Sequence, residues 1–394
     1  MVSTQGELSG KWLRNILVDH IAETNDSQEK SINLPTTNFI GTIWIKCQAT
    51  VLNADDDADM TTNNFLDVVK RIRIEGNSSA VICTLTGKEL RNILARYYGE
   101  LPRRQLTHKN GEYEQIEFPI LFGRFYHDRE YILPAKLFTD LKLYIDYNLS
   151  DVADPGWTTA TFTIDVAIDQ LVSSHSGEGV PFIRKREIET GTTKAGDILV
   201  DMPLGGAYKA IMVQSEDDDV DTGVSISKVK LSLDSETEVP FTRRWIDLEE
   251  DNKAELGLPQ ATLAGVVCKA DTGTQITDLG TIESVVCMME ETFPGGTDGL
   301  SIGATHAGGT ITFNVTEIDE LDVAAEADIA PIQFIAKAKA AVPECVFIIF
   351  DKNSDMDLLL DSSKYNKVET VLTGVDTNAT YSVCLEDVIS ISRG

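Results

Sequence analysis

Side-chain polarity alternates with a period of two residues through most of this sequence, and this pattern restricts the fold more than any other feature. In a β-strand with one buried face, successive side chains point to opposite sides, so apolar and polar residues alternate. Runs of this kind extend from Phe39 to Val51, from Leu141 to Leu149 and from Phe162 to Ile168. Clusters of turn-forming residues, such as Gly76 to Ser79, separate the runs. The sequence therefore predicts an all-β protein built from sandwiches or barrels.

Helical patterns are few and short. Thr86 and Glu89 have the spacing of a capping box, and apolar residues follow at helical intervals, which predicts a helix from Gly87 to Tyr98. A second helix is expected around Thr242 to Leu248. At the N-terminus, an apolar stripe beside basic residues predicts a third, amphipathic helix with Ser9 as its N-cap. The stripe and its neighbours are Lys11, Trp12, Leu13, Arg14, Ile16, Leu17 and Ile21.

The length of 394 residues favours two or three domains, since a typical domain has roughly 150 residues. The stretch from Ser173 to Gly196 is rich in Ser, Gly, Thr and charged residues and interrupts the alternation. We therefore predict an N-terminal arm with the amphipathic helix at residues 1–31 and a first β domain at residues 32–178. A linker at residues 179–196 and a second β domain at residues 197–394 complete the prediction.

The second domain repeats the order of features in the first. In each, a strand is followed by an acidic loop, a hairpin and a helix candidate, with the hairpin turns at Asn77-Ser78-Ser79 and Asp234-Ser235-Glu236. Alternation makes unrelated strands look alike, so similarity of single strands has little weight. The shared order of four different features favours an internal duplication.

The charge balance argues against a nucleic-acid-binding surface. With 34 Lys and Arg against 63 Asp and Glu, the formal net charge is −29, which repels phosphate backbones. The composition of 42% hydrophobic and 25% charged residues is that of an ordinary globular protein. We expect a folded, soluble protein with no direct nucleic-acid contact.

Export, membrane-spanning and disulfide signals are all weak. The first twenty residues lack the apolar core of about 7 to 15 residues of a secretory signal, and no apolar run approaches the roughly 20 residues of a spanning helix. The six cysteines are widely spaced, so most are expected to be buried thiols. They are Cys47, Cys83, Cys268, Cys287, Cys345 and Cys384.

Candidate catalytic and metal-binding patterns are present but incomplete. Gly299 to Gly303 has G-x-S-x-G spacing, yet a loop precedes it and no helix follows, as a nucleophile elbow requires. The two acidic loops have D-x-D-x-D spacing at Asp55, Asp57 and Asp59 and at Asp217, Asp219 and Asp221, but lack the later Gly and Glu of a calcium loop. The histidines are scattered, and no phosphate-binding loop occurs. We predict no catalytic residue, no metal site and no cofactor.

Four segments of the first domain resemble major capsid proteins of the double jelly-roll lineage, which form the shells of tailless icosahedral viruses, usually over an internal membrane. The segments are Leu34 to Gly41, Phe118 to Phe125, Glu130 to Lys136 and Leu141 to Tyr147. The second domain is similar mainly in length and order of elements. The chain departs from the family in its acidity, and no long tower loop is identified between its strands.

The resemblance implies two tandem eight-stranded jelly rolls with a few short helices, and three chains forming a pseudo-hexagonal capsomer. It implies a non-enzymatic viral major capsid protein that tiles an icosahedral shell over a lipid membrane. The protein would be made in the host cytoplasm and located in the virion. Its partners would be further copies of itself, minor capsid and vertex proteins and, through the N-terminal helix, lipid.

The N-terminal stripe is the one candidate contact site. Basic and aromatic residues on an amphipathic helix are typical of a helix that lies at a lipid interface. Packing of this arm on a neighbouring subunit is an equally good interpretation. The proposed membrane or inner-face contacts are Lys11, Trp12, Arg14, Ile16 and Leu17.

Two further interpretations are open. Short basic clusters such as Arg184-Lys185-Arg186 and Arg243-Arg244 are expected to pair with the abundant carboxylates rather than with phosphate. The alternative function is a carbohydrate-binding or carbohydrate-processing β-sandwich, in which paired carboxylates would do acid–base chemistry. The absence of an export signal and an aromatic content of only 7% weaken this alternative.

Overall fold

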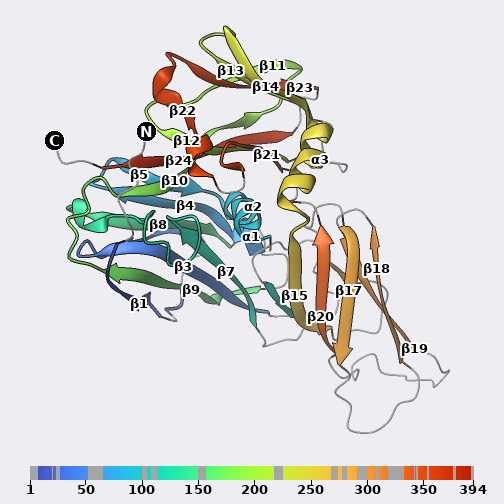
Figure 1. Ribbon diagram of the computed structural model, residues 1–394. Coiled ribbons are helices and arrows are strands. Elements are labelled where there is room, and N and C mark those ends of the chain that lie inside the picture. The colour runs from blue at the N-terminus through green and yellow to red at the C-terminus, as the bar shows by residue number, and fades with distance from the viewer. Residues whose placement is uncertain are drawn as a thin grey trace.

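The computed structural model is mostly β and describes most of the chain. The described residues are 8–19, 21–23, 27–51, 65–99, 104–107, 113–149, 157–216, 225–267, 274–276, 282–290, 300–307, 310–317, 332–340, 342, 345–352, 355–375 and 379–391. Two sandwiches and a further group of strands that projects beyond them make up the described part of the molecule (Figure 1).

The first sandwich contains eight strands in two sheets. The strand orders are β1-β9-β3-β7 and β2-β8-β4-β5, all paired antiparallel. The strands are β1 (Lys11–Val18), β2 (Ser27–Asn33), β3 (Phe39–Val51), β4 (Val69–Gly76), β5 (Ala80–Leu85), β7 (Tyr113–Leu121), β8 (Leu141–Asn148) and β9 (Trp157–Val172).

The second sandwich has the same strand order. Its sheets are β10-β24-β12-β21 and β11-β23-β13-β14, and the short β22 (Leu360–Asp361) pairs with β12. The strands are β10 (Pro181–Thr192), β11 (Gly196–Asp201), β12 (Ala207–Glu216), β13 (Ile226–Leu233), β14 (Glu238–Arg244), β21 (Cys345–Ile349), β23 (Val368–Gly374) and β24 (Thr380–Ser390). Two eight-stranded sandwiches of this topology are jelly rolls. The prediction of a double jelly roll is confirmed.

A helix follows the fifth strand of each jelly roll. The capping box of α2 (Gly87–Tyr98) is present as predicted, because Glu89 donates its backbone N–H to Thr86 Oγ1 and its carboxylate accepts from the Thr86 N–H. Helix α3 (Trp245–Leu256) starts and ends later than the predicted segment. The remaining helices among the described residues are the short α1 (Phe65–Val68), η1 (Ala135–Leu137), η4 (Met356–Leu358) and η5 (Ser362–Lys364).

The hairpins of the two jelly rolls have the same hydrogen bonds. Asn77 and Asp234 both have positive φ, 51° and 47°, which Asn and Asp tolerate better than most residues. Asn77 Oδ1 accepts from Thr139 N at 2.8 Å, and Asp234 Oδ1 accepts from Asn366 N at 2.7 Å. Each partner lies two residues before the strand that pairs with the hairpin, β8 or β23. The equivalence supports the predicted internal duplication.

The predicted N-terminal amphipathic helix is wrong. Residues 11–18 form β1, which pairs antiparallel with β9 along its whole length. The apolar spacing fits a helix. In the structure the segment is instead an edge strand whose backbone pairs with β9, with an irregularity in the pairing between Ile16 and Val18. The region predicted as an arm thus supplies β1 and β2 to the first jelly roll.

The interpretation of residues 179–196 as a linker is also wrong. Pro181–Thr192 forms β10, the first strand of the second jelly roll. Its polar side chains are paired within the protein, for example Arg184 with Asp387 on the adjacent β24. Such partners, distant in sequence, explain why a buried strand has the composition of a linker.

A long insertion follows α3, contrary to the expectation that no tower loop is present. It contains β15 (Gln260–Val267), β16 (Thr274–Ile276), β17 (Ile282–Glu290), β18 (Leu300–Ala307), β19 (Thr310–Glu317) and β20 (Ile332–Ala340). Strand β15 pairs in parallel with β6 (Arg104–Thr107), which pairs with β7. The insertion therefore extends a sheet of the first jelly roll, and Figure 1 shows it projecting beyond both sandwiches.

The alternating apolar residues fill the two sandwiches as expected. One core lies within the first jelly roll and continues into the second through Phe182, Met212 and Cys384. A second core, including Tyr208 and Trp245, fills the second jelly roll. A core shared between the halves favours a single rigid body.

Candidate functional site: the junction of the two jelly rolls

The two jelly rolls share one continuous sheet. Strand β5, at the edge of the first, runs parallel to β10, at the edge of the second, with Cys83 opposite Lys185 and Thr84 opposite Arg186. The shared sheet runs from β2 to β21 (Figure 1). This contact is short, so further interactions are needed to fix the junction.

A buried group of charged side chains provides them. Arg96 on α2 of the first jelly roll forms ion pairs with Asp351 and Glu386 of the second. Lys209 Nζ lies 2.9 Å from Asp351 Oδ2. The side chains in these pairs are at most 5% exposed. Because lone buried charges are very costly, their mutual pairing ties the two halves together.

Lys185 and Tyr97 complete this group, which we call the junction cluster: Arg96, Tyr97, Lys185, Lys209, Asp351 and Glu386. The Tyr97 hydroxyl donates to Glu386 Oε1 at 2.8 Å, and Lys209 Nζ lies 4.4 Å from the Tyr97 ring centroid. Lys185 Nζ is 3.8 Å from Glu386 Oε1 and donates to the Leu121 carbonyl. The three cations exceed the two anions by one.

In the junction cluster, burial and neighbouring charges shift the pKa values of Lys185 and Glu386 in opposite directions. Burial lowers the pKa of Lys185 to about 8, although Glu386 opposes the change. Burial alone would raise the pKa of the Glu386 carboxyl, but Lys209, Arg96 and Lys185 hold it below its ordinary value. Burial also lowers the pKa of Lys209. Loss of one proton from Lys185 would leave two cations and two anions in the junction cluster.

The basic clusters bind carboxylates, as predicted. Arg184 and Arg186 both contact Asp387, which is 1% exposed. At the surface, Arg243 pairs with Asp251 and Arg244 with Asp247. These arginines serve the fold and are not gathered into a phosphate-binding surface.

The five predicted contact residues lie on β1, at the free edge of its sheet. Trp12 packs against His127 with ring centroids 4.6 Å apart, and Leu17 packs on the first core. Arg14 Nε donates to Asp169 Oδ1 at 2.7 Å. Lys11 and Ile16 are exposed, Ile16 by 65%. The structure thus brings the five residues onto one strand but not onto one face.

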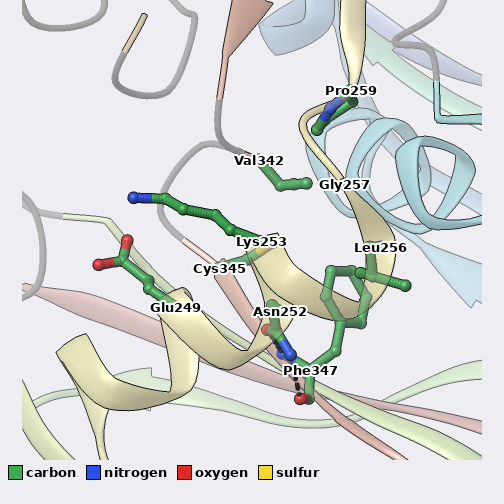
Figure 2. Close-up of a pocket in the computed structure, with 9 residues that line it drawn as sticks. All are labelled: Glu249, Asn252, Lys253, Leu256, Gly257, Pro259, Val342, Cys345 and Phe347. Atoms are coloured by element: carbon green, nitrogen blue, oxygen red, sulfur yellow. Dashed lines mark hydrogen bonds between the residues drawn. The ribbon is translucent and has the colours of Figure 1, made fainter. Parts of the chain in front are cut away.

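A small hollow lies where the insertion leaves the second jelly roll (Figure 2). Its volume is about 330 Å³ including the open solvent at its mouth. Asn252 bridges α3 and β21, donating to the Phe347 carbonyl at 2.9 Å and accepting from the Phe347 N–H at 2.7 Å. Leu256, Pro259 and Val342 give it an apolar lining, with Glu249 and Lys253 also bordering it. The hollow lies where the insertion joins the second jelly roll. Its lining residues do not include a nucleophile–base pair.

The other candidate patterns do not assemble a site in the described residues. Both acidic loops lie outside them. Leu300–Ala307 is a strand paired with β19, so Ser301 is not on the strand-to-helix turn of a nucleophile elbow. No group of three His, Cys, Asp or Glu suited to a metal occurs among the residues described, and none of their helices is long and apolar enough to cross a membrane. Cys47, Cys83, Cys345 and Cys384 are buried free thiols, as predicted.

Sequence reasoning missed the junction cluster. Its members come from five separate places along the chain, and only the basic triplet around Lys185 was noticed. The available signal was this triplet, Arg184-Lys185-Arg186, because charged residues in the interior of a strand need buried partners.

The chain is similar in fold to several solved viral structures. The crystal structure of the STIV MCP matches with a TM-score of 0.58 and 12% identity, covering 96% of this chain and 97% of that one. An atomic structure of Sulfolobus turreted icosahedral virus matches with a TM-score of 0.59 and 13% identity, covering 96% and 91%. The major capsid protein of bacteriophage PM2 matches with a TM-score of 0.53 and 10% identity, covering 97% and 99%.

No family model and no curated protein sequence matches the chain. The likeness is therefore one of fold, and it extends over nearly the whole length of both proteins. The double jelly-roll resemblance inferred from the sequence holds at this level.

Proposed function

We propose that the chain is the major capsid protein of a virus and that its function is to assemble with copies of itself into a shell. The observation that carries this proposal is the fold: two duplicated jelly rolls joined by a shared sheet and a buried charge cluster form a rigid block suited to tiling. Proteins that match over almost their whole length include major capsid proteins. The role is structural rather than enzymatic.

Three chains would form the assembly unit. Each chain supplies two jelly rolls of the same topology, so a trimer presents six and approximates a hexagon. Closed symmetry is the usual outcome for a homo-oligomer. Such capsomers would tile an icosahedral shell, with minor capsid and vertex proteins as further partners in the virion, after synthesis in the host cytoplasm.

Contact with an underlying membrane is a separate proposal. As a strand, β1 cannot lie at a lipid interface in the manner of an amphipathic helix. Lys11, Arg14 and Ile16 are the exposed members of the five residues. Lys11, the first residue of β1, would make an inner-face contact, while Trp12, Leu17 and the Arg14 ion pair hold the strand in place. Flotation of the purified protein with anionic vesicles tests this, with Lys11→Glu as the variant expected to lose binding.

The molar mass in solution tests the assembly proposal. Three chains of 43.2 kDa give about 130 kDa, and each carries a formal charge of −29. Screening of this repulsion should favour association. Light scattering after size-exclusion chromatography is expected to show trimers that grow into larger particles at molar salt. A monomer at both low and molar salt would reject the proposal, and binding or cleavage on a glycan panel would then support the carbohydrate alternative.

A further inference from the structure

Two strand edges meet at the junction of the jelly rolls, and each has a duplicate elsewhere in the described chain that is not paired there. Within the chain, β5 of the first jelly roll pairs with β10 of the second. The duplicate of β5 is β14 and the duplicate of β10 is β1. Among the described strands, β14 and β1 are both terminal in their sheets, with no strand beyond them.

Equivalence of β5 and β14 rests on their surroundings. Each is the second strand of a hairpin with a positive-φ turn and leads directly into a helix of 12 residues. Gly99 and Gly257 end the two helices, both with positive φ. Counting back from the helix starts, Cys83 corresponds to Phe241 and Thr84 to Thr242.

Equivalence of β1 and β10 rests on a repeated ion pair. Arg14 lies opposite Asp169 on β9, and Arg184 lies opposite Asp387 on β24. In both, the arginine Nε donates to one carboxylate oxygen, at 2.7 and 3.0 Å, and the terminal nitrogen donates to the other. Counting along the strands from these arginines, Leu13 corresponds to Ile183 and Ile16 to Arg186.

Burial differs between the equivalent strands. Ile183 on β10 is 0% exposed, whereas Leu13 on β1 is 41% exposed and Ile16 is 65% exposed. On β14 six of the seven residues are exposed, and Val239 is exposed by 41%. Its counterpart on β5, Val81, is half-buried. An open edge strand with apolar side chains is a template for strand pairing.

We propose that β14 of one copy pairs in parallel with β1 of a second copy, repeating between chains the contact that β5 and β10 make within one chain. This inference rests on the proposed self-assembly and specifies its interface. Continuation of the internal register places Phe241 beside Asn15, Thr242 beside Ile16 and Val239 beside Leu13 of the neighbouring chain. The exposed side chains of Leu13 and Val239 would then cover each other.

The repeated contact explains why the assembly closes. It joins two different surfaces, so it is head-to-tail and forms a ring if the rotation per step closes. Six equivalent steps, three within chains and three between them, close a ring when each turns the next jelly roll by about one sixth of a turn. Three copies of this chain satisfy that number.

The contact between chains would be weaker than the one within a chain. At the equivalent positions, Lys185 is replaced by Asn15 and Arg96 by Ala254, so the junction cluster has no counterpart. Without buried ion pairs to form, the edges can associate and separate as intact folded chains. The junction cluster thus distinguishes the permanent contact from the reversible one.

Disulfide trapping tests the register. Neighbouring strands lie about 4.8 Å apart, within the Cα separation that a disulfide spans. A chain carrying both Leu13→Cys and Val239→Cys is oxidised under assembling conditions and run on a non-reducing gel. The control carries Leu13→Cys and Leu199→Cys, because Leu199 is 60% exposed on β11, at the opposite edge of the sheet that contains β14. Wild-type protein reports any crosslinking by the native cysteines.

We expect a reducible ladder that ends at the covalent trimer for the Leu13–Val239 pair and monomers for the control. Trimers that form without this crosslink, a ladder that continues past three, or equal crosslinking of the control would each overturn the inference while leaving self-assembly intact. Failure of the wild-type chain to associate at any salt concentration would reject the proposed function as well.

A charge placed on the edge gives a second readout. Ile16→Glu introduces a carboxylate at an exposed position and should raise the concentration for half-assembly at least about tenfold, as expected when a charge is desolvated without a partner. Leu199→Glu should leave it unchanged. Equal values for both variants and the wild type would count against β1 as the interface.

Discussion

Arg96 of the first jelly roll and Glu386 of the second form an ion pair in which both side chains are at most 5% exposed. Because the two residues are 290 positions apart and lie on α2 and β24, this pair links the two halves directly. Arg96 also binds Asp351, so one guanidinium holds two carboxylates that follow or lie on strands of the second jelly roll. Arg96 therefore helps to fix the relative orientation of the halves, together with the shared sheet and the shared core.

Removal of Arg96 should destabilise the whole protein. Arg96→Met leaves two buried carboxylates with fewer cations, and we expect a loss of about 3–5 kcal/mol in the free energy of unfolding. Arg243→Met is the matched control, since both partners of its ion pair are more than half exposed and the pair contributes roughly 0–1 kcal/mol. Urea unfolding of the three proteins measures the difference. Similar losses for both variants would contradict the role given to the junction cluster.

Lys185 predicts a specific pH dependence. Its pKa falls from an ordinary 10.5 to about 8 through burial, so between these values the unfolded chain binds a proton that the folded protein has released. The free energy of unfolding should therefore rise with pH in this window, by about 3 kcal/mol from this group, and the cost of the buried charge is present below about pH 8.

The variant Lys185→Met isolates this effect. We expect the free energy of unfolding of this variant not to rise with pH in this window. The difference in unfolding free energy between variant and wild type should therefore change between about pH 7 and about pH 10. Unfolding in urea at both pH values measures it. Parallel pH profiles for the two proteins would show that Lys185 does not titrate in the window.

The two equivalent turns should respond alike to substitution. Asn77→Ala and Asp234→Ala each remove a side chain that accepts from a backbone N–H just before the neighbouring strand β8 or β23, and leave alanine at a positive φ. A loss of about 1–3 kcal/mol is expected for each. Asn77→Gly keeps the backbone conformation accessible and should cost less than Asn77→Ala. Thermal unfolding distinguishes these variants, and unequal effects at the two turns would argue against their equivalence.

The buried cysteines should resist thiol reagents in the folded protein. Burial raises the pKa of Cys47 and of Cys83 to about 12, so few thiolates are present near neutral pH. We expect labelling of these two sites, followed by mass spectrometry of the peptides, only on unfolding. The exposed thiol of Leu199→Cys provides the positive control. Rapid labelling of Cys47 or Cys83 in native protein would indicate local opening of the core.

The features predicted correctly from the sequence are those determined by local signals. The Thr86 capping box and the turns at Asn77 and Asp234 depend on residues a few positions apart, so the helix and the duplicated hairpins were identifiable. The alternation of apolar and polar residues likewise reflects burial of one face of a strand, and it predicted the all-β class and the two sandwiches.

The errors concern segments whose structure is decided by distant partners. The apolar spacing around Ile16 fits a helix as well as a strand, and pairing with β9 decides between them. Lys185 lies in a segment that has the composition of a linker, and only its contacts with Glu386 and Leu121 make a buried lysine tolerable there. The insertion was missed because its alternation resembles that of the surrounding strands.

The pairing of β6 with β15 has a consequence for how the chain is made. Strand β6 leaves the ribosome with the first jelly roll, but the strand beside it is part of the insertion in the second. Until that later segment has been synthesised, the edge of β6 in the nascent first domain has no neighbouring strand and is open to pairing with other chains. Folding of this sheet during translation therefore finishes only after the insertion has been synthesised.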